Sequence, residues 1–197
     1  SPSRHVLSDL SLSATEAPFG GRVPVLVPRS VPEGTRLPLV IALHGLGEAS
    51  DPVLAARAWP ELYGLLDAAD RLAAPPILPR GKRGDLTSEH AAAMTRELAA
   101  RPFAGLIVAC PFTPNPAKAI DRQAHLARYA AWIRDTVVPR ARERFPVERE
   151  ATGTHLAGCS MGGSVVVELL ERCRGVFGSA ALVQSALLSL AITVLQF

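Results

Sequence analysis

Short apolar runs alternate with amphipathic segments along most of the chain. Continuous apolar stretches, typical of strands buried on both faces, lie at residues 37–43, 106–110 and 176–183. A shorter run at residues 155–157 predicts one more strand. At residues 121–145, apolar side chains recur every three or four positions, which predicts an amphipathic helix against a sheet. This alternation predicts an α/β fold, with a mostly parallel sheet covered by helices on both faces.

The first thirty residues have a different pattern, and we treat residues 1–30 as N-terminal edge strands of the same domain. Residues 6–13 and 21–27 alternate loosely, are rich in Val and Leu, and are interrupted by prolines. Because proline is tolerated at sheet edges, these segments predict an antiparallel pair. Further helices are predicted at residues 61–74, 88–100 and 161–173.

A G-x-S-x-G motif, with Ser160 at its centre, lies between a predicted strand and a predicted helix. This context is that of a nucleophile elbow, in which the serine occupies a strained turn and its neighbours must lack bulky side chains. Gly158 and Gly162 meet that need, and Gly163 extends the motif. The N-terminus of the following helix favours negative charge, so the backbone N–H of Met161 is a candidate oxyanion-hole donor.

The loop after the strand at residues 37–43 has the sequence His44-Gly45-Leu46-Gly47. Where a nucleophile elbow is present, a loop after an earlier strand of the sheet supplies the second oxyanion donor. We assign this donor to the N–H of Leu46, with Gly45 and Gly47 as near alternatives. The competing interpretation is a strand-ending turn beside an unrelated glycine-rich serine turn, and the order of the two motifs argues against it.

Together these motifs resemble the esterase family of α/β-hydrolases that includes esterase D-like, feruloyl esterase-like and enterochelin esterase-like enzymes. The resemblance extends over residues 21–185. The matching stretches are residues 37–47, 129–139, 155–163 and 177–185. It implies an α/β-hydrolase fold and hydrolysis of a small-molecule carboxylic ester or thioester through an acyl-enzyme on Ser160, with no metal or organic cofactor.

The remaining triad residues do not follow Ser160 in the expected order of serine, acid and histidine. No histidine occurs after Ser160, and the only later acids, Glu168 and Glu171, lie about 12 Å or more along the predicted helix. Among the earlier histidines, we expect His155 to be a buried, hydrogen-bonded residue of the strand below the elbow, and His90 and His125 to be exposed. The sequence therefore predicts a domain whose C-terminal part is missing, truncated after the nucleophile half.

Charge and cysteine content exclude several other classes of function. The net charge is +3, and arginines alternate with glutamates, so no basic stripe suited to nucleic acid forms. The three cysteines, expected to be buried free thiols, have no zinc-ligand spacing, so we expect no metal site. The loop at residues 75–84 carries Arg80, Lys82 and Arg83; a solvated surface loop is favoured over an anion-binding one.

Both ends of the chain leave questions open. Residues 186–197 form an atypical apolar tail without charge, but polar interruptions leave fewer residues than the roughly 20 that a membrane-spanning helix needs. The chain opens at Ser1 without a signal segment, so a cytoplasmic protein and a secreted one both stay possible. Its oligomeric state is also open.

Three functions remain compatible with the sequence. The first is a serine esterase, impaired in this form because a serine hydroxyl without a base is a weak nucleophile. The second is a non-catalytic α/β-hydrolase-like binding module, although such a module has no need of a strained elbow. The third is an acyltransferase that passes the same acyl group to an alcohol instead of water.

Overall fold

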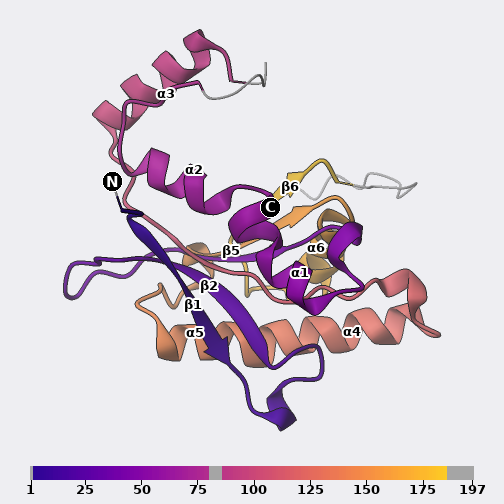
Figure 1. Cartoon of the computed structure of the whole chain (residues 1–197). Helices are drawn as coiled ribbons and strands as arrows, with labels where there is room; N and C mark the ends of the chain where they lie inside the picture. The colour runs from indigo at the N-terminus through magenta and orange to yellow at the C-terminus, as the bar shows by residue number, and fades with distance from the viewer. Residues whose placement is uncertain (1, 80–85, 186–197) are drawn as a thin grey trace.

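The computed structural model describes residues 2–79 and 86–185, and its centre is a six-stranded mixed sheet (Figure 1). The strand order is β1-β2-β4-β3-β5-β6. The β1–β2 and β2–β4 pairs are antiparallel, and the other pairs are parallel. The strands are β1 (His5–Ser11), β2 (Arg22–Pro28), β3 (Leu39–Leu43), β4 (Ile107–Ala109), β5 (Thr154–Cys159) and β6 (Ser179–Val183).

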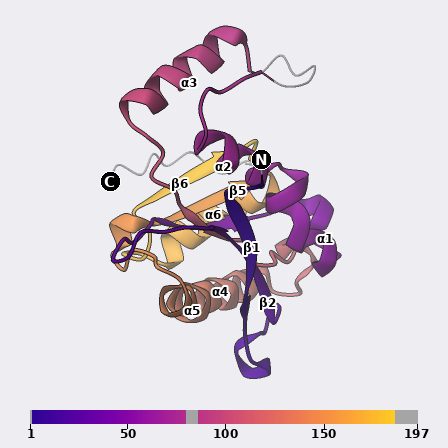
Figure 2. The ribbon, with the colours of Figure 1, turned by 60° about the vertical axis from the view of Figure 1, so that its left-hand side comes forward.

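Six α-helices join and cover these strands in the described part of the chain. They are α1 (Pro52–Arg57), α2 (Leu65–Leu72), α3 (Ser88–Ala100), α4 (Arg122–Trp132), α5 (Val138–Arg144) and α6 (Met161–Arg172). A π-helical stretch, Ile133–Val137, makes α4 and α5 one continuous helix, which the Asp121 carboxylate caps by accepting from the N–H of Ala124. Helix α3 stands away from the sheet in all three ribbon views (Figure 2).

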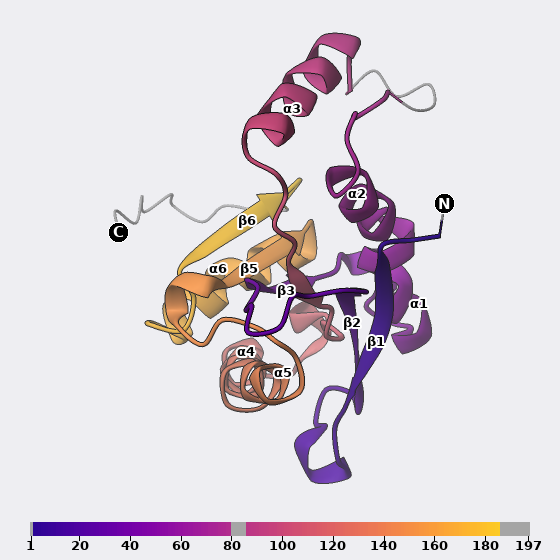
Figure 3. The same ribbon diagram turned by 90° about the vertical axis from the view of Figure 1, so that its left-hand side faces the viewer.

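Each face of the sheet has its own hydrophobic core. On one face, α4, α5 and α6 pack on inward residues of the central strands, among them Ile41, Ile107 and Leu156. On the other face, Ala69 of α2 packs on Ala42 and on neighbouring residues of β2 and β4. Figure 3 shows α4 and α5 on one side of β3 and α2 on the other. The prediction of helices on both faces of a mostly parallel sheet is therefore confirmed.

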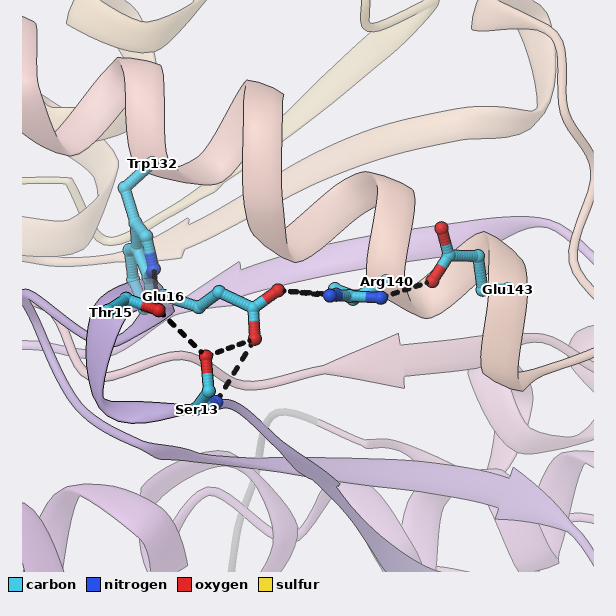
Figure 4. Close-up of polar contacts among 6 residues, drawn as sticks. All are labelled: Ser13, Thr15, Glu16, Trp132, Arg140 and Glu143. Carbon is cyan, nitrogen blue, oxygen red and sulfur yellow. Dashed lines mark hydrogen bonds and ion pairs between the residues drawn. The ribbon is translucent and has the colours of Figure 1, made fainter.

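The hairpin formed by β1 and β2 is fastened to the long helix by one polar cluster (Figure 4). The Glu16 carboxylate accepts hydrogen bonds from Ser13 and from the Arg140 guanidinium, and these lower its pKa to about 2. The indole Nε1 of Trp132 donates to the Glu16 carbonyl oxygen at 2.8 Å. Arg140 also pairs with Glu143. A loop distant in sequence is thereby held against the α4–α5 helix.

Several element predictions agree with the structure and others need correction. The antiparallel pair, the helix at residues 88–100 and the long helix at residues 121–145 are found where expected. The helix predicted from residue 61 begins only at Leu65, because a π-helical stretch (Ala58–Leu62) and a left-handed Gly64 precede it. Helix α1 was not predicted.

The strand predicted at residues 176–183 is present as β6, but the prediction that it is buried is wrong. All five residues of β6 are exposed, and β6 is the edge strand that pairs only with β5. The cationic loop residues Arg80, Lys82 and Arg83 and the tail at residues 186–197 lie outside the described residues.

Candidate active site

Ser160 occupies the turn between β5 and α6, so its predicted strand-to-helix position is confirmed. Its backbone has φ 51° and ψ −113°, a conformation that side-chain-bearing residues rarely adopt and that stores strain. The turn is held from outside, because the N–H of Ser160 donates to the carbonyl of Val183 in β6 at 3.0 Å. The hydroxyl of Ser160 has no hydrogen-bond partner among the described residues.

The glycines around Ser160 are needed because backbones approach one another there. A Cβ on Gly158 would lie under 3.0 Å from backbone atoms of Gly162 and Gly163. A Cβ on Gly162 would overlap the carbonyl oxygens of Leu43 and His44, and one on Gly163 would overlap the side chain of Ser185. The elbow is thus a tight crossing of the turn with the end of β3.

The loop at residues 44–47 lies beside Ser160 because of strand register. Leu43 of β3 is paired with Gly158 of β5, so the segments that follow both strands leave the sheet at the same level. An ideal Cβ placed on Gly45 would be 3.6 Å from the Cβ of Ser160. Gly47 has open space around its Cα, with no atom within 4 Å of an added Cβ.

The backbone donors of the two loops differ in whether they are already engaged. The N–H of Gly45 donates to the hydroxyl of Tyr63 at 3.0 Å, so this donor is already engaged. The N–H groups of Leu46 and Met161 have no acceptor within the described part of the chain. Both therefore remain available to a ligand atom.

His44 is a buried residue that fixes the shape of its loop. Its Nδ1 lies 2.9 Å from the carbonyl oxygen of Gly45, and its Nε2 accepts from the N–H of Thr113 at 2.9 Å. This pattern requires the neutral ring with the proton on Nδ1. Burial lowers the pKa of His44, which favours the same neutral form. Both ring nitrogens are occupied, so His44 is not placed to deprotonate Ser160.

Thr113 extends this support to helix α4. The hydroxyl of the fully buried Tyr129 donates to the carbonyl of Phe112 at 3.0 Å and lies 3.3 Å from the Thr113 hydroxyl. A hydrogen-bonded path therefore runs from α4 through the loop after β4 to His44. The helical periodicity placed Tyr129 on the apolar face of α4, but no sequence pattern indicated a role for Thr113.

Two further polar residues, Tyr63 and Glu48, lie next to the elbow, and no sequence prediction included them. Tyr63 donates its hydroxyl proton to Glu48 Oε2 at 2.7 Å while accepting from Gly45. Burial, followed by the charge of Glu48, raises the pKa of the half-buried Cys159 thiol, so this thiol is a poor nucleophile beside Ser160. No motif signals Tyr63, because its relation to the loop arises only in the folded chain.

The other histidines are engaged away from Ser160. His155 Nδ1 lies 2.9 Å from the Ser179 hydroxyl, and His5 Nδ1 lies 2.7 Å from Asp70. His155 is half-buried rather than buried, since the neighbouring β6 is uncovered. His90 is exposed as expected. The predicted exposure of His125 is wrong: this residue is half-buried, because its ring packs edge-on against Phe19.

The acidic residues after the elbow also face elsewhere. Glu168 forms ion pairs with Arg122 and Arg172, and Glu171 is exposed. Of the three cysteines, Cys110 and Cys173 are buried as predicted, and Cys159 is only half-buried. Within residues 2–79 and 86–185 no group of three acidic, His or Cys side chains could hold a metal ion, and no helix has the length and apolarity to cross a membrane.

Comparison with known proteins gives matches at the level of structure. No family model and no curated protein sequence matches the chain. The S-formylglutathione hydrolase of Staphylococcus aureus superposes with a TM-score of 0.58 at 18% identity, covering 94% of this chain and 60% of that one. A ferulic acid esterase gives 0.60 at 16% identity, covering 93% and 59%.

A third match is the fluorophosphonate-binding serine hydrolase F of Staphylococcus aureus, with a TM-score of 0.53 at 15% identity, covering 94% of this chain and 58% of that one. The chain spans about three fifths of the length of these structures. Identities this low relate the proteins through their fold. By its strand order, helix layers and structural matches, the chain has an α/β-hydrolase fold.

Proposed function

We propose that this chain carries the nucleophile and oxyanion-hole half of a serine hydrolase that acts on carboxylic esters or thioesters. The observation that supports this most is the strained Ser160, at φ 51°, between close-packed glycines and beside the loop at residues 44–47. A strained residue of this kind persists only where the surrounding structure enforces it, and such residues cluster at functional sites. The fold shared with serine ester hydrolases supports the same conclusion.

In the proposed reaction, the Ser160 hydroxyl oxygen attacks the ester carbonyl carbon while its proton passes to a base. The carbonyl π-electron pair moves onto oxygen, and the oxyanion is bound by the N–H groups of Leu46 and Met161. Collapse of this intermediate expels the alcohol or thiol, which takes up the proton, and leaves an acyl group on Ser160. Water then repeats the sequence and releases the acid.

We assign no histidine of this chain as the base. His44 uses both ring nitrogens, and the remaining histidines have partners or positions away from Ser160. Without a base the serine hydroxyl attacks slowly, and loss of triad function leaves about 10³- to 10⁴-fold catalysis over water. We therefore expect feeble turnover of p-nitrophenyl acetate by the 197-residue chain.

The decisive experiment is covalent labelling of Ser160. The chain is incubated with a fluorophosphonate probe, and the modified peptide is identified by mass spectrometry. We expect slow modification at Ser160 that Ser160→Ala abolishes and Cys159→Ala preserves, since the thiol beside it is not the nucleophile. Added imidazole should speed the labelling by acting as an external base.

A non-catalytic binding module is the second candidate, because the hydroxyl of Ser160 has no hydrogen-bond partner among the described residues. It would take over if Ser160 resisted the probe with and without imidazole while the protein stayed folded. Labelling at Cys159 instead would contradict both the elbow assignment and the role given to Ser160.

A further inference from the structure

Glu48 is a half-buried carboxylate at the end of the short helix Leu46–Glu48, which begins within the loop at residues 44–47. Its Oε2 accepts the hydroxyl proton of Tyr63 at 2.7 Å, and Tyr63 in turn accepts from Gly45. These bonds fix the carboxylate relative to the loop. The proposed reaction assigns no chemical step to this carboxylate.

The Glu48 carboxylate and the Ser160 side chain both lie close to Gly45. An ideal Cβ on Gly45 would be 3.6 Å from Glu48 Oε2 and also 3.6 Å from the Cβ of Ser160. Glu48 Oε2 and the Cβ of Ser160 are therefore separated by at most twice that distance. A substrate with its carbonyl at Ser160 can therefore place a neighbouring group within a few ångströms of Glu48.

The groups around the elbow respond to this charge. After burial, Glu48 is a further cause that raises the pKa values of Cys159 and Tyr63. It also opposes the lowering of the His44 pKa by burial. The negative charge thus reaches three residues near Ser160: His44 in the loop after β3, Cys159 at the end of β5 and Tyr63 before α2.

Nothing in the described part of the chain neutralises this charge with a full positive one. No described Lys or Arg forms an ion pair with Glu48. The N-terminus of α6 supplies about half a positive elementary charge. An oxyanion forming at Ser160 beside a charged Glu48 would bring two negative charges to this place, more than the helix dipole balances.

We propose that Glu48 is a specificity-determining residue that selects esters with a cationic group, such as an ammonium, close to the scissile carbonyl. The cation pairs with the carboxylate and offsets its repulsion of the oxyanion. This inference rests on the proposed function, because it places the scissile carbonyl at Ser160.

The test compares two p-nitrophenyl esters of the same shape, 4-(trimethylammonio)butyrate and its neutral isostere 5,5-dimethylhexanoate. Acylation of Ser160 is followed by intact-protein mass, and the rate for Ser160→Ala is subtracted. At low ionic strength we expect the cationic ester to react about fivefold faster, because two charges a few ångströms apart attract by about 1 kcal/mol in a water-rich site. The preference should shrink as salt is added.

Two variants separate the charge of Glu48 from other effects. Glu48→Gln keeps an oxygen that accepts from Tyr63 but removes the charge, so the rate ratio of the two esters should fall to about one. Glu171→Gln makes the same charge change at an exposed position of α6 and should leave the ratio unchanged. A thermal melt of each variant shows whether it is folded.

Two failures can be told apart. If neither ester acylates Ser160, the proposed function fails, and binding of the unreactive amides 4-(trimethylammonio)butyramide and 5,5-dimethylhexanamide then decides the role of Glu48. Selective shifts of the Gly45 and Cys159 amide signals by the cationic amide, lost in Glu48→Gln, would support that role. Equal acylation by both esters, a ratio unchanged in Glu48→Gln, or equal shifts by both amides would overturn it.

Discussion

The two loops that meet at Ser160 are held in place by different means. The elbow at residues 158–163 is shaped by backbone packing, with glycines where a Cβ would overlap the neighbouring backbone. The loop at residues 44–48 is shaped by polar side chains, since His44 binds Thr113 and Gly45, and Tyr63 binds Gly45 and Glu48. One loop depends on the absence of side chains and the other on their hydrogen bonds.

This difference determines how each loop should respond to change. A side chain that overlaps backbone atoms lowers the stability of the folded state strongly, because the interior is close-packed and the backbone must move. A lost hydrogen bond costs less, although a buried group left without a partner adds a penalty. The elbow should therefore tolerate substitution less than the loop, and the loop alone should respond to pH.

The largest effect is expected from Gly162→Ala. Its methyl group would overlap the carbonyl oxygens of Leu43 and His44, so β3 and the start of α6 must separate. We expect a loss of about 3 kcal/mol in the free energy of unfolding, measured by urea denaturation. Gly47→Ala is the matched control, because no atom lies within 4 Å of its added methyl group, and it should change stability by less than about 0.5 kcal/mol. Equal effects of the two substitutions would refute the packing account.

The elbow could be predicted from the sequence because its cause is local. The pattern of Gly158, Ser160 and Gly162 requires only that a strand, a tight turn and a helix follow one another, and the apolar runs indicate those elements. The order of the two loop motifs along the chain was enough to place them together, since β3 and β5 are neighbours in the parallel sheet. The fold class could be predicted for the same reason.

The support of the loop at residues 44–48 could not be predicted because its partners are far apart in sequence. Thr113 is 69 residues from His44, and no periodicity or motif marks their hydrogen bond. Burial of β6 was also predicted wrongly, because an apolar run shows what a strand can bury but not whether a helix covers it. Long-range contacts of this kind are decided by the tertiary structure.

A second, smaller effect is expected from His44→Leu. This substitution keeps an apolar side chain in the buried site but leaves the N–H of Thr113 and the carbonyl of Gly45 without partners. We expect a loss of about 2 kcal/mol in the free energy of unfolding. His90→Leu is the control, since His90 is exposed on α3 and its replacement should cost less than about 0.5 kcal/mol. Hydrogen exchange in His44→Leu should rise at residues 44–48 and stay low at residues 158–163; a uniform rise would show that the loops are not held independently.

The smallest effect, and the one that separates the two loops most cleanly, is expected from mild acid. Burial lowers the pKa of His44 below its usual 6.5, so the neutral ring contributes stability that is fully present above pH 6.5 and is lost as the pH falls toward the folded-state pKa. Protonated Nε2 would face the N–H of Thr113, donor against donor, and would open the loop.

Between pH 7 and pH 6 the titration of His44 can lower the free energy of unfolding by at most about 0.7 kcal/mol, because the unfolded chain gains less than one proton at this site. After correction for intrinsic exchange rates, amide exchange should therefore quicken at residues 44–48 and not at residues 158–163, where the one titratable side chain, Cys159, has a pKa raised by burial and stays neutral in this range. In His44→Leu the loop should exchange at the same corrected rate at both pH values. Acid-induced exchange that persisted in this variant would mean that another group, and not His44, gives the loop its pH dependence.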